Sequence, residues 1–268
     1  MFIDEVYKYI EEEYQGDFGN LHIVEVRIGL FLCAIKLSND FAGVAGVIRG
    51  DEIHQIEKKD RDFGDFTPLK IAGKKISDLF KFDKDTAMVR VLKIASLNAY
   101  FQSLLIKGKY NFLAKTDPID ILNLSRYKNV VMIGAFTSYI RKISEFGINL
   151  HVLELDENAF LPLYKKYYVP PEKYKELLPE ADLVIITGLT LVNNTFDWLL
   201  QYIPKSSQSI IIGPSASIVP DLFFENGINM VGATFITDYK KLFELVGQGA
   251  AGYHLFEYCA EKITVFND

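Results

Sequence analysis

The sequence predicts an α/β protein in which a Rossmann-like, doubly wound parallel sheet follows a smaller α+β unit. After residue 110, short apolar runs at 130–133, 150–155, 183–187, 210–212 and 230–235 alternate with helical or looped connections. Continuous Val, Ile and Leu strands separated by crossovers are typical of a parallel sheet covered on both faces. Before residue 110, three strand-like runs lie close together, which indicates an antiparallel meander.

The N-terminal unit, residues 1–110, begins with an amphipathic helix. Phe2, Val6 and Ile10 recur at helical spacing, and Gly16 ends the pattern. Strand candidates follow at 21–28, 31–37 and 44–49, and helical patterns at 76–80 and 86–106. We therefore expect an α+β domain that consists of a three-stranded antiparallel meander plus helices.

The C-terminal unit, residues 111–268, contains helix-start signals between its strands. An Asp-Pro pair opens a short helix that runs from Pro118 to Tyr127. Further helices are expected at 196–203, capped by Asn194 or Thr195, from Pro220 to Gly227, and after Asp238. We expect the helix after Asp238 to be one long final helix.

Composition restricts the class of protein. The chain has 268 residues and a formal net charge of -6, with Lys and Arg scattered, so no basic nucleic-acid surface is indicated. Its apolar runs are far shorter than the roughly 20 residues of a membrane span, and the N-terminus shows no signal peptide. Cys33 and Cys259 form no C-x-x-C pair, which fits a reducing cytoplasm. We expect a cytoplasmic homo-oligomer, a dimer, that binds neither nucleic acid nor membrane.

The first strand of the C-terminal unit ends in a glycine turn that resembles a nucleotide site only in part. Gly134 follows the strand, and Glu154 stands about 20 residues later, where a dinucleotide fold places its ribose-binding acid. Phe136 and Tyr139 occupy positions where glycine would let a pyrophosphate approach the backbone. A plain strand-to-helix turn is therefore favoured over dinucleotide binding, although Glu154 could still bind a smaller ligand with a ribose or amine.

Small polar residues follow the third and fourth strands of this unit. They are Thr187, Gly188, Thr190, Asn193, Asn194 and Thr195 after one strand, and Gly213, Pro214 and Ser215 after the other. Ligands of open α/β sheets bind outside the carboxyl ends of the strands, so these two edges predict one side of a pocket. Amide, hydroxyl and backbone N–H groups suit a carboxylate, a phosphate or a polar metal complex. The alternative is structural: one residue of the first group caps a helix, and Ser215 caps a turn.

Several kinds of chemistry lack support. Ser215 is not in a G-x-S-x-G elbow, so a hydrolase triad is not indicated. The histidines, at positions 22, 54, 151 and 254, form no metal-binding motif, and the acidic run at 60–65 lacks the rest of a calcium loop. Neither catalytic residues nor metal ligands can be assigned.

The motifs together resemble a known family, the proteins with a heavy-metal-chelation domain. The resemblance is carried by the segment 181–195 with its T-G and N-x-T pieces, the G-P-S turn at 213–215, the G-x-F turn at 134–136, and upstream pieces at 27–30, 72–74 and 95–99. It implies an enolase N-terminal-like domain before the Rossmann-like domain. It also implies a site between the two domains, to which Asn98 contributes from the N-terminal side, and a role in handling a heavy metal or its chelate.

Soft metal ligands are absent near the matched motifs, so a bound metal needs oxygen ligands, an organic chelator or residues brought together across domains or subunits. We expect it to bind as a chelate or with a small polar molecule. Two alternatives stay open. One is an enzyme acting on a small polar or anionic substrate, with a nucleoside-containing cofactor near Gly134 and Glu154; the other is a non-catalytic scaffold. We expect alanine at Asn98, Thr187, Asn193 or Ser215 to change the melting temperature by only a few degrees, as for polar surface residues.

Overall fold

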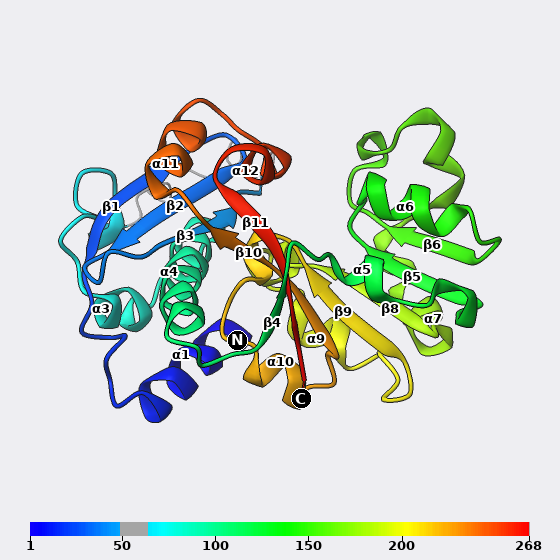
Figure 1. The fold of residues 1–268 in the computed structure, drawn as a ribbon, viewed down its shortest axis with the longest axis horizontal. Coiled ribbons are helices and arrows are strands. Elements are labelled where there is room, and N and C mark those ends of the chain that lie inside the picture. Colours follow the sequence, from blue (N-terminus) through cyan, green and yellow to red (C-terminus); the bar gives the residue numbers. More distant parts are fainter. Residues whose placement is uncertain (49–63, 268) are drawn as a thin grey trace.

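The computed structural model describes residues 1–48 and 64–267 and contains two β-sheets (Figure 1). One has the order β1-β2-β3 and the other the order β4-β11-β10-β9-β8-β5-β6-β7. The predicted α/β class, with a small antiparallel sheet and a large, mostly parallel one, is confirmed.

The small sheet is the expected antiparallel meander. Its strands are β1 (Ile23–Ile28), β2 (Leu32–Leu37) and β3 (Ala42–Gly46). Helices of this part are α1 (Phe2–Glu13), α3 (Ile76–Lys81) and α4 (Ala87–Ile106). Helix α4 starts where predicted because Thr86 caps it, accepting from the Val89 N–H at 3.2 Å. The expected end of the third strand at residue 49 lies outside the described residues, and within those residues no helix is long and apolar enough to cross a membrane.

Helix α4 packs unusually close to β3 because the residues between them are small. A Cβ added to Gly43 would lie 2.2 Å from the Ala99 nitrogen and 2.3 Å from the Ala95 oxygen. Every residue of β3 is buried. Glycine is thus required at position 43 by the close approach of two backbones.

The large sheet contains all five strands expected after residue 110. They are β5 (Asn129–Ile133), β6 (Asn149–Leu153), β8 (Leu183–Thr187), β9 (Gln208–Ile212) and β10 (Met230–Ile236), and all pair in parallel. Strand β5 lies between β6 and β8. The chain moves outward from β5 to β6 and then returns to β8 on the other side. The topological switch point, where α/β sheets bind ligands, therefore lies between the ends of β5 and β8.

Three strands of the large sheet were not expected. They are β4 (Phe112–Ala114), β7 (Tyr168–Val169) and β11 (Ala260–Phe266). The prediction of one long final helix is wrong: α11 (Tyr239–Gly247), capped by Asp238 as expected, and α12 (Gly252–Tyr258) precede β11. Gly249, with φ +78°, breaks the helix because it adopts a left-handed conformation. Strand β11 then pairs antiparallel with both β10 and β4.

The remaining helices are short. They are α5 (Pro118–Ile121), α6 (Thr137–Ser144), α7 (Tyr174–Leu177), α8 (Leu189–Val192), α9 (Phe196–Leu200) and α10 (Asp221–Glu225). The helix expected to reach Tyr127 ends at Ile121, and a separate 3₁₀ turn follows at Leu124–Arg126. The helix expected at 196–203 likewise ends early, at Leu200.

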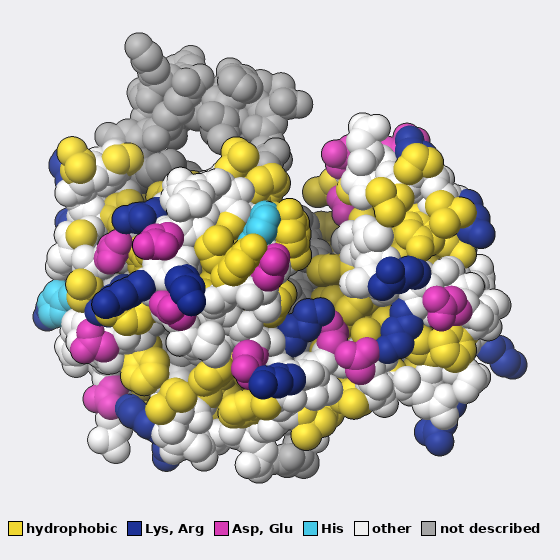
Figure 2. Space-filling model, turned by 45° about the horizontal axis from the view of Figure 1, so that its top comes forward, with side chains coloured by type: hydrophobic (Ala, Val, Ile, Leu, Met, Phe, Trp, Pro, Cys, Tyr) yellow, Lys and Arg dark blue, Asp and Glu magenta, His cyan; other side chains and the backbone are white. Residues whose placement is uncertain are grey.

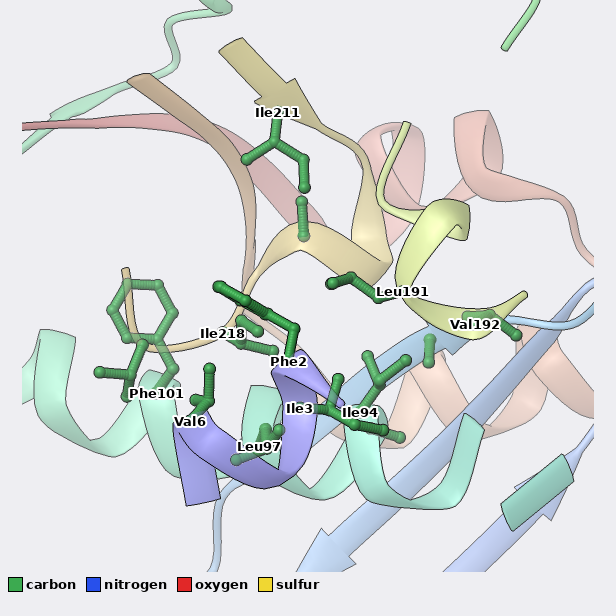
Figure 3. Packing of buried hydrophobic residues seen from close by; sticks show 14 of the residues in the cluster. Phe2, Ile3, Val6, Ile94, Leu97, Phe101, Leu191, Val192, Ile211 and Ile218 are labelled. Atoms are coloured by element: carbon green, nitrogen blue, oxygen red, sulfur yellow. The ribbon is translucent and has the colours of Figure 1, made fainter. Parts of the chain in front are cut away.

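The two sheets belong to one packed body. Phe2, Ile3 and Val6 of α1 lie in one cluster with residues of α4, α8 and β9 (Figure 3). On the other side of the small sheet, Leu32 and Val44 pack against α11 and α12 from the C-terminal end of the chain. A boundary at residue 110 stays a prediction, because these cores join elements from both sides of it.

Candidate functional site

A cavity of about 300 Å³ lies at the carboxyl end of β9 and beside the middle of β10, between α5 and α6 on one side and α12 and β11 on the other. Its walls are mainly apolar and include the rings of Phe136, Tyr253 and Phe256 together with Pro118 and Pro214. Figure 2 shows the surface hollowed between the two halves of the molecule, with hydrophobic side chains on the walls and charged ones beside it. A concave, mostly apolar site with a few polar groups is typical of small-molecule binding.

Three of the predicted site residues line this cavity: Phe136, Gly213 and Pro214. Gly213 has φ +107°, a conformation that favours glycine, and this turns the chain away from β9. Its N–H still donates to the Gly232 carbonyl at 3.1 Å. The G-P-S turn therefore forms a wall of the cavity through its first two residues.

Gly134 and Thr187 meet at the switch point. Gly134 has φ +95°, and an added Cβ would lie 3.0 Å from the Thr187 Cβ. Glu154 approaches from β6, and its carboxylate accepts from the N–H groups of Ala135 at 2.9 Å, Leu155 at 2.7 Å and Asp156 at 3.2 Å. Glu154, which the sequence left open as a contact for a ligand with a ribose or amine, thus holds the strand-to-helix turn in place.

Asn98 and Ser215 lie between the two units, where the resemblance implied a site. Both are buried and hydrogen-bond one unit to the other, and we call such a residue a tie. The Asn98 amide donates to the Pro214 carbonyl at 2.8 Å and to the Val44 carbonyl, and Ser215 Oγ accepts from the Gly46 N–H at 2.8 Å. Their side chains are only 1% and 2% exposed, so the expectation of a small stability effect for alanine loses its premise at these positions. That expectation now applies to Thr187 and Asn193 alone.

Gly188 joins the same contacts through its backbone. A Cβ at this position would lie 2.4 Å from the Ala216 nitrogen and 2.8 Å from the Ser215 carbonyl carbon. The glycine of the T-G motif therefore allows α8 to lie directly on the G-P-S turn.

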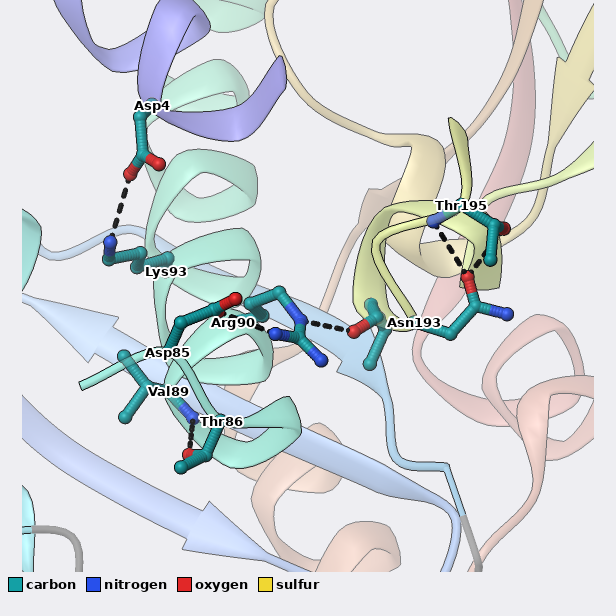
Figure 4. A network of polar contacts seen from close by, with 9 residues as sticks. Asp4, Asp85, Thr86, Val89, Arg90, Lys93, Asn193 and Thr195 are labelled. Carbon is teal, nitrogen blue, oxygen red and sulfur yellow. Dashed lines mark hydrogen bonds and ion pairs between the residues drawn. The ribbon is translucent and has the colours of Figure 1, made fainter. Parts of the chain in front are cut away.

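The polar residues in α8 and directly after it do not line the cavity. The buried Thr190 hydroxyl donates to the Thr187 carbonyl at 2.7 Å. Asn193 Oδ1 accepts from the Thr195 N–H at 3.2 Å and from its hydroxyl at 2.6 Å (Figure 4). Asn194 is exposed with φ +58°, and no side chain caps α9. Arg90 Nε of α4 donates to the Val192 carbonyl at 2.6 Å, so this turn is fixed to the N-terminal unit.

A polar group that the sequence did not suggest lies beside the cavity. Asp117 accepts from the Tyr139 hydroxyl on one oxygen and from Lys262 Nζ at 2.6 Å on the other. All three residues line the cavity. The Asp117-Pro118 pair predicts only the start of a helix, and the Asp117 side chain makes no cap hydrogen bond there. Tyr139 is predicted only to obstruct the approach of a pyrophosphate. Lys262 could not be seen because its strand was not predicted.

Metal-binding groups are sparse in the described part of the chain. Residues 1–48 and 64–267 contain no group of three or more His, Cys, Asp or Glu that could hold a metal ion. His54 and most of the acidic run at 60–65 lie outside these residues. Burial raises the pKa of the Cys33 thiol to about 12 and that of Cys259 to about 11, so both are protonated at neutral pH.

Two family models match the chain, one over residues 117–265 and one over residues 11–101, and both are described as "Putative heavy-metal chelation". An uncharacterised protein of Methanocaldococcus jannaschii is 30% identical over 181 residues; the match covers 66% of this chain and 65% of that protein, slightly under two thirds of its length.

Two crystal structures share the fold. A DUF364-family protein of unknown function from Pyrococcus horikoshii aligns over 100% of both chains, with a TM-score of 0.78 and 18% identity. A protein of the same family from Desulfitobacterium hafniense has a TM-score of 0.68 and 17% identity, covering 97% of this chain and 99% of its own. At these identities the two structures support the fold alone.

Proposed function

Because this chain belongs to the family described by heavy-metal chelation, we propose that it binds a heavy metal as the complex of a small organic chelator. The proposed place is the cavity between α6, α12, the end of β9 and the middle of β10. The observation that carries the proposal is the lining of this cavity, which combines aromatic and proline walls with one charged pair. Flat apolar walls suit the organic part of a chelate, and the charged pair suits its polar edge.

In this proposal, aromatic and charged residues of the cavity have different roles. Phe136, Tyr253 and Phe256 pack against the chelator ring, because aromatic faces gain contact area at little entropic cost. Asp117 and Lys262 face its polar atoms. The chelator supplies the nitrogen and oxygen donors to the metal, as suits a borderline-soft ion such as Zn²⁺.

The test is metal retention with and without a chelator. The purified protein is dialysed, incubated with Zn²⁺ alone or with Zn²⁺ and picolinate, a flat pyridine carboxylate, and analysed by elemental analysis after gel filtration. We expect retained zinc only with picolinate. Near-stoichiometric zinc without a chelator contradicts the proposal, and so does the absence of retained zinc both with picolinate and with bipyridine, a flat chelator that has no carboxylate.

Two tyrosines of α12 provide a matched pair of variants. Tyr253 lines the cavity and is 68% exposed, whereas Tyr258 is 51% exposed and does not line it. We expect Tyr253→Ala to reduce retention of the zinc chelate and Tyr258→Ala to leave it unchanged. Equal loss in both variants means that α12 acts through its stability rather than through the cavity.

A further inference from the structure

Thr234 of β10 faces the cavity. Side chains alternate along a strand, so Thr234 and Gly232 lie on the same face of the sheet. A Cβ on Gly232 would lie 2.9 Å from the ring of Pro118, which lines the cavity, and Thr234 lines it too. In the antiparallel pairing with β11, Thr234 stands directly opposite Lys262. Directly opposed side chains share one face of the sheet, about 5 Å apart at Cβ, so the side chains of Thr234 and Lys262 start side by side on the cavity face.

The hydroxyl of Thr234 is the unsatisfied group of an otherwise satisfied residue. The Thr234 N–H donates to Ser217 Oγ at 2.8 Å, and its carbonyl accepts from Gln102 Nε2 at 2.7 Å. The side chain is 2% exposed, and its hydroxyl has no hydrogen-bond partner among the described residues. By contrast, the Thr264 hydroxyl on the same face donates to the Thr116 carbonyl at 2.9 Å. Buried hydroxyls are normally bonded, so an unbonded one beside a cavity indicates a ligand.

We infer that the Thr234 hydroxyl and the Lys262 ammonium group bind a carboxylate of the chelator, an inference that rests on the proposed function. An ammonium group has three donors, of which Asp117 takes one, and a hydroxyl can rotate to donate. A carboxylate accepts two such bonds at once. The ligand class is therefore a flat aromatic chelator that carries a carboxylate, and a neutral chelator of similar shape lacks this interaction.

The structure offers a close control for a Thr234 variant. Thr234→Val replaces the hydroxyl by a methyl group of similar volume. Ser209 of the neighbouring strand β9 also has a buried hydroxyl without a partner among the described residues, but it lies at the amino end of the strand and does not line the cavity. Ser209→Ala removes the same kind of group away from the proposed ligand.

The experiment measures the affinity of the wild type, Thr234→Val, Ser209→Ala and Lys262→Gln for Zn²⁺–picolinate by titration calorimetry. Zn²⁺–bipyridine, whose chelator is flat but carries no carboxylate, is the comparison. We expect Thr234→Val and Lys262→Gln to weaken picolinate binding about tenfold or more, as for a lost hydrogen bond to a charged group. Ser209→Ala should bind picolinate as the wild type does, and the bipyridine complex should bind the wild type and Thr234→Val equally. Thr234→Val should also melt at or above the wild-type temperature.

The outcomes separate the inference from the proposed function. Unchanged picolinate affinity in Thr234→Val, or equal weakening in Ser209→Ala, overturns the inference while the cavity remains the site. A lower melting temperature for Thr234→Val also overturns it, because the hydroxyl then has a partner within the protein. A wild type that binds the bipyridine complex but not the picolinate complex overturns only the inference that the ligand carries a carboxylate. A wild type that binds neither complex overturns both proposals.

Discussion

Asn98 is a buried tie between α4 and the G-P-S turn, and its removal should cost the protein a measurable part of its stability. Replacing it by alanine removes two hydrogen bonds, to the Pro214 carbonyl at 2.8 Å and to the Val44 carbonyl, and leaves both carbonyls without this donor. Each loss costs about 1–3 kcal/mol, and removing the unpartnered Asn98 Oδ1 returns part of it. We expect a net destabilisation of about 2–4 kcal/mol, or roughly 5–15 °C in melting temperature.

The assay is urea unfolding monitored by far-UV circular dichroism. The dependence of the free energy of unfolding on urea concentration is compared between variants. Asn149→Ala is the control, since its side chain is exposed and donates to Asn129 Oδ1 at 3.1 Å; it should change the free energy of unfolding by about 0.5 kcal/mol or less. Asn98→Asp should be worse than Asn98→Ala, because a carboxylate cannot donate to two carbonyls. A value for Asn98→Ala within about 0.5 kcal/mol of the wild type would refute the assignment of this amide as a structural tie.

Three further outcomes follow from other contacts. Gly43→Val should prevent folding, because a Cβ at this position would lie 2.2 Å from the Ala99 nitrogen. Gly252→Ala should fold, because the nearest atom to an added Cβ is 3.9 Å away. Soluble yield and circular dichroism test both variants. Hydrogen bonds from the N–H groups of Asn129 and Lys128 lower the pKa of Asp182. The contribution of its carboxylate to the free energy of unfolding is therefore present above the ordinary carboxyl pKa and is lost as pH falls through the lowered pKa. The stability gap between wild type and Asp182→Ala should therefore shrink in acid, and a gap independent of pH contradicts this. Burial raises the thiol pKa values of Cys33 and Cys259, so the stability that their buried thiols contribute is full below pH about 9 and is lost as pH rises toward 11–12. Both cysteines should resist a thiol reagent at pH about 8 until urea unfolds the chain. Rapid labelling of the native protein argues against this burial.

The sequence predicted the parallel strands because their patterns are local and strong. The run at 183–187 is a continuous apolar strand, and it is β8 in the structure. Strand β11 was missed for the opposite reason: Glu261 and Lys262 interrupt its apolar residues, and no glycine or proline separates it from α12. Short strands such as β4 and β7 gain their backbone partners only from neighbours distant in the chain, and a local pattern contains little of that information.

The sequence by itself determined the fold class and the glycine turns at the strand ends, and it predicted the edge of the sheet where we propose that a ligand binds. Only the tertiary structure decided which polar groups face a cavity and which serve as ties. Asn98, Glu154 and Ser215 have suitable chemistry for a site, yet their polar atoms bond to backbone groups of neighbouring elements. Asp117, Tyr139 and Lys262 come from three distant segments and meet because β11 pairs antiparallel with β10 beside α5 and α6. The physical reason is that a side chain's function depends on which of its hydrogen-bonding atoms the fold leaves unsatisfied, and contacts distant in sequence decide that.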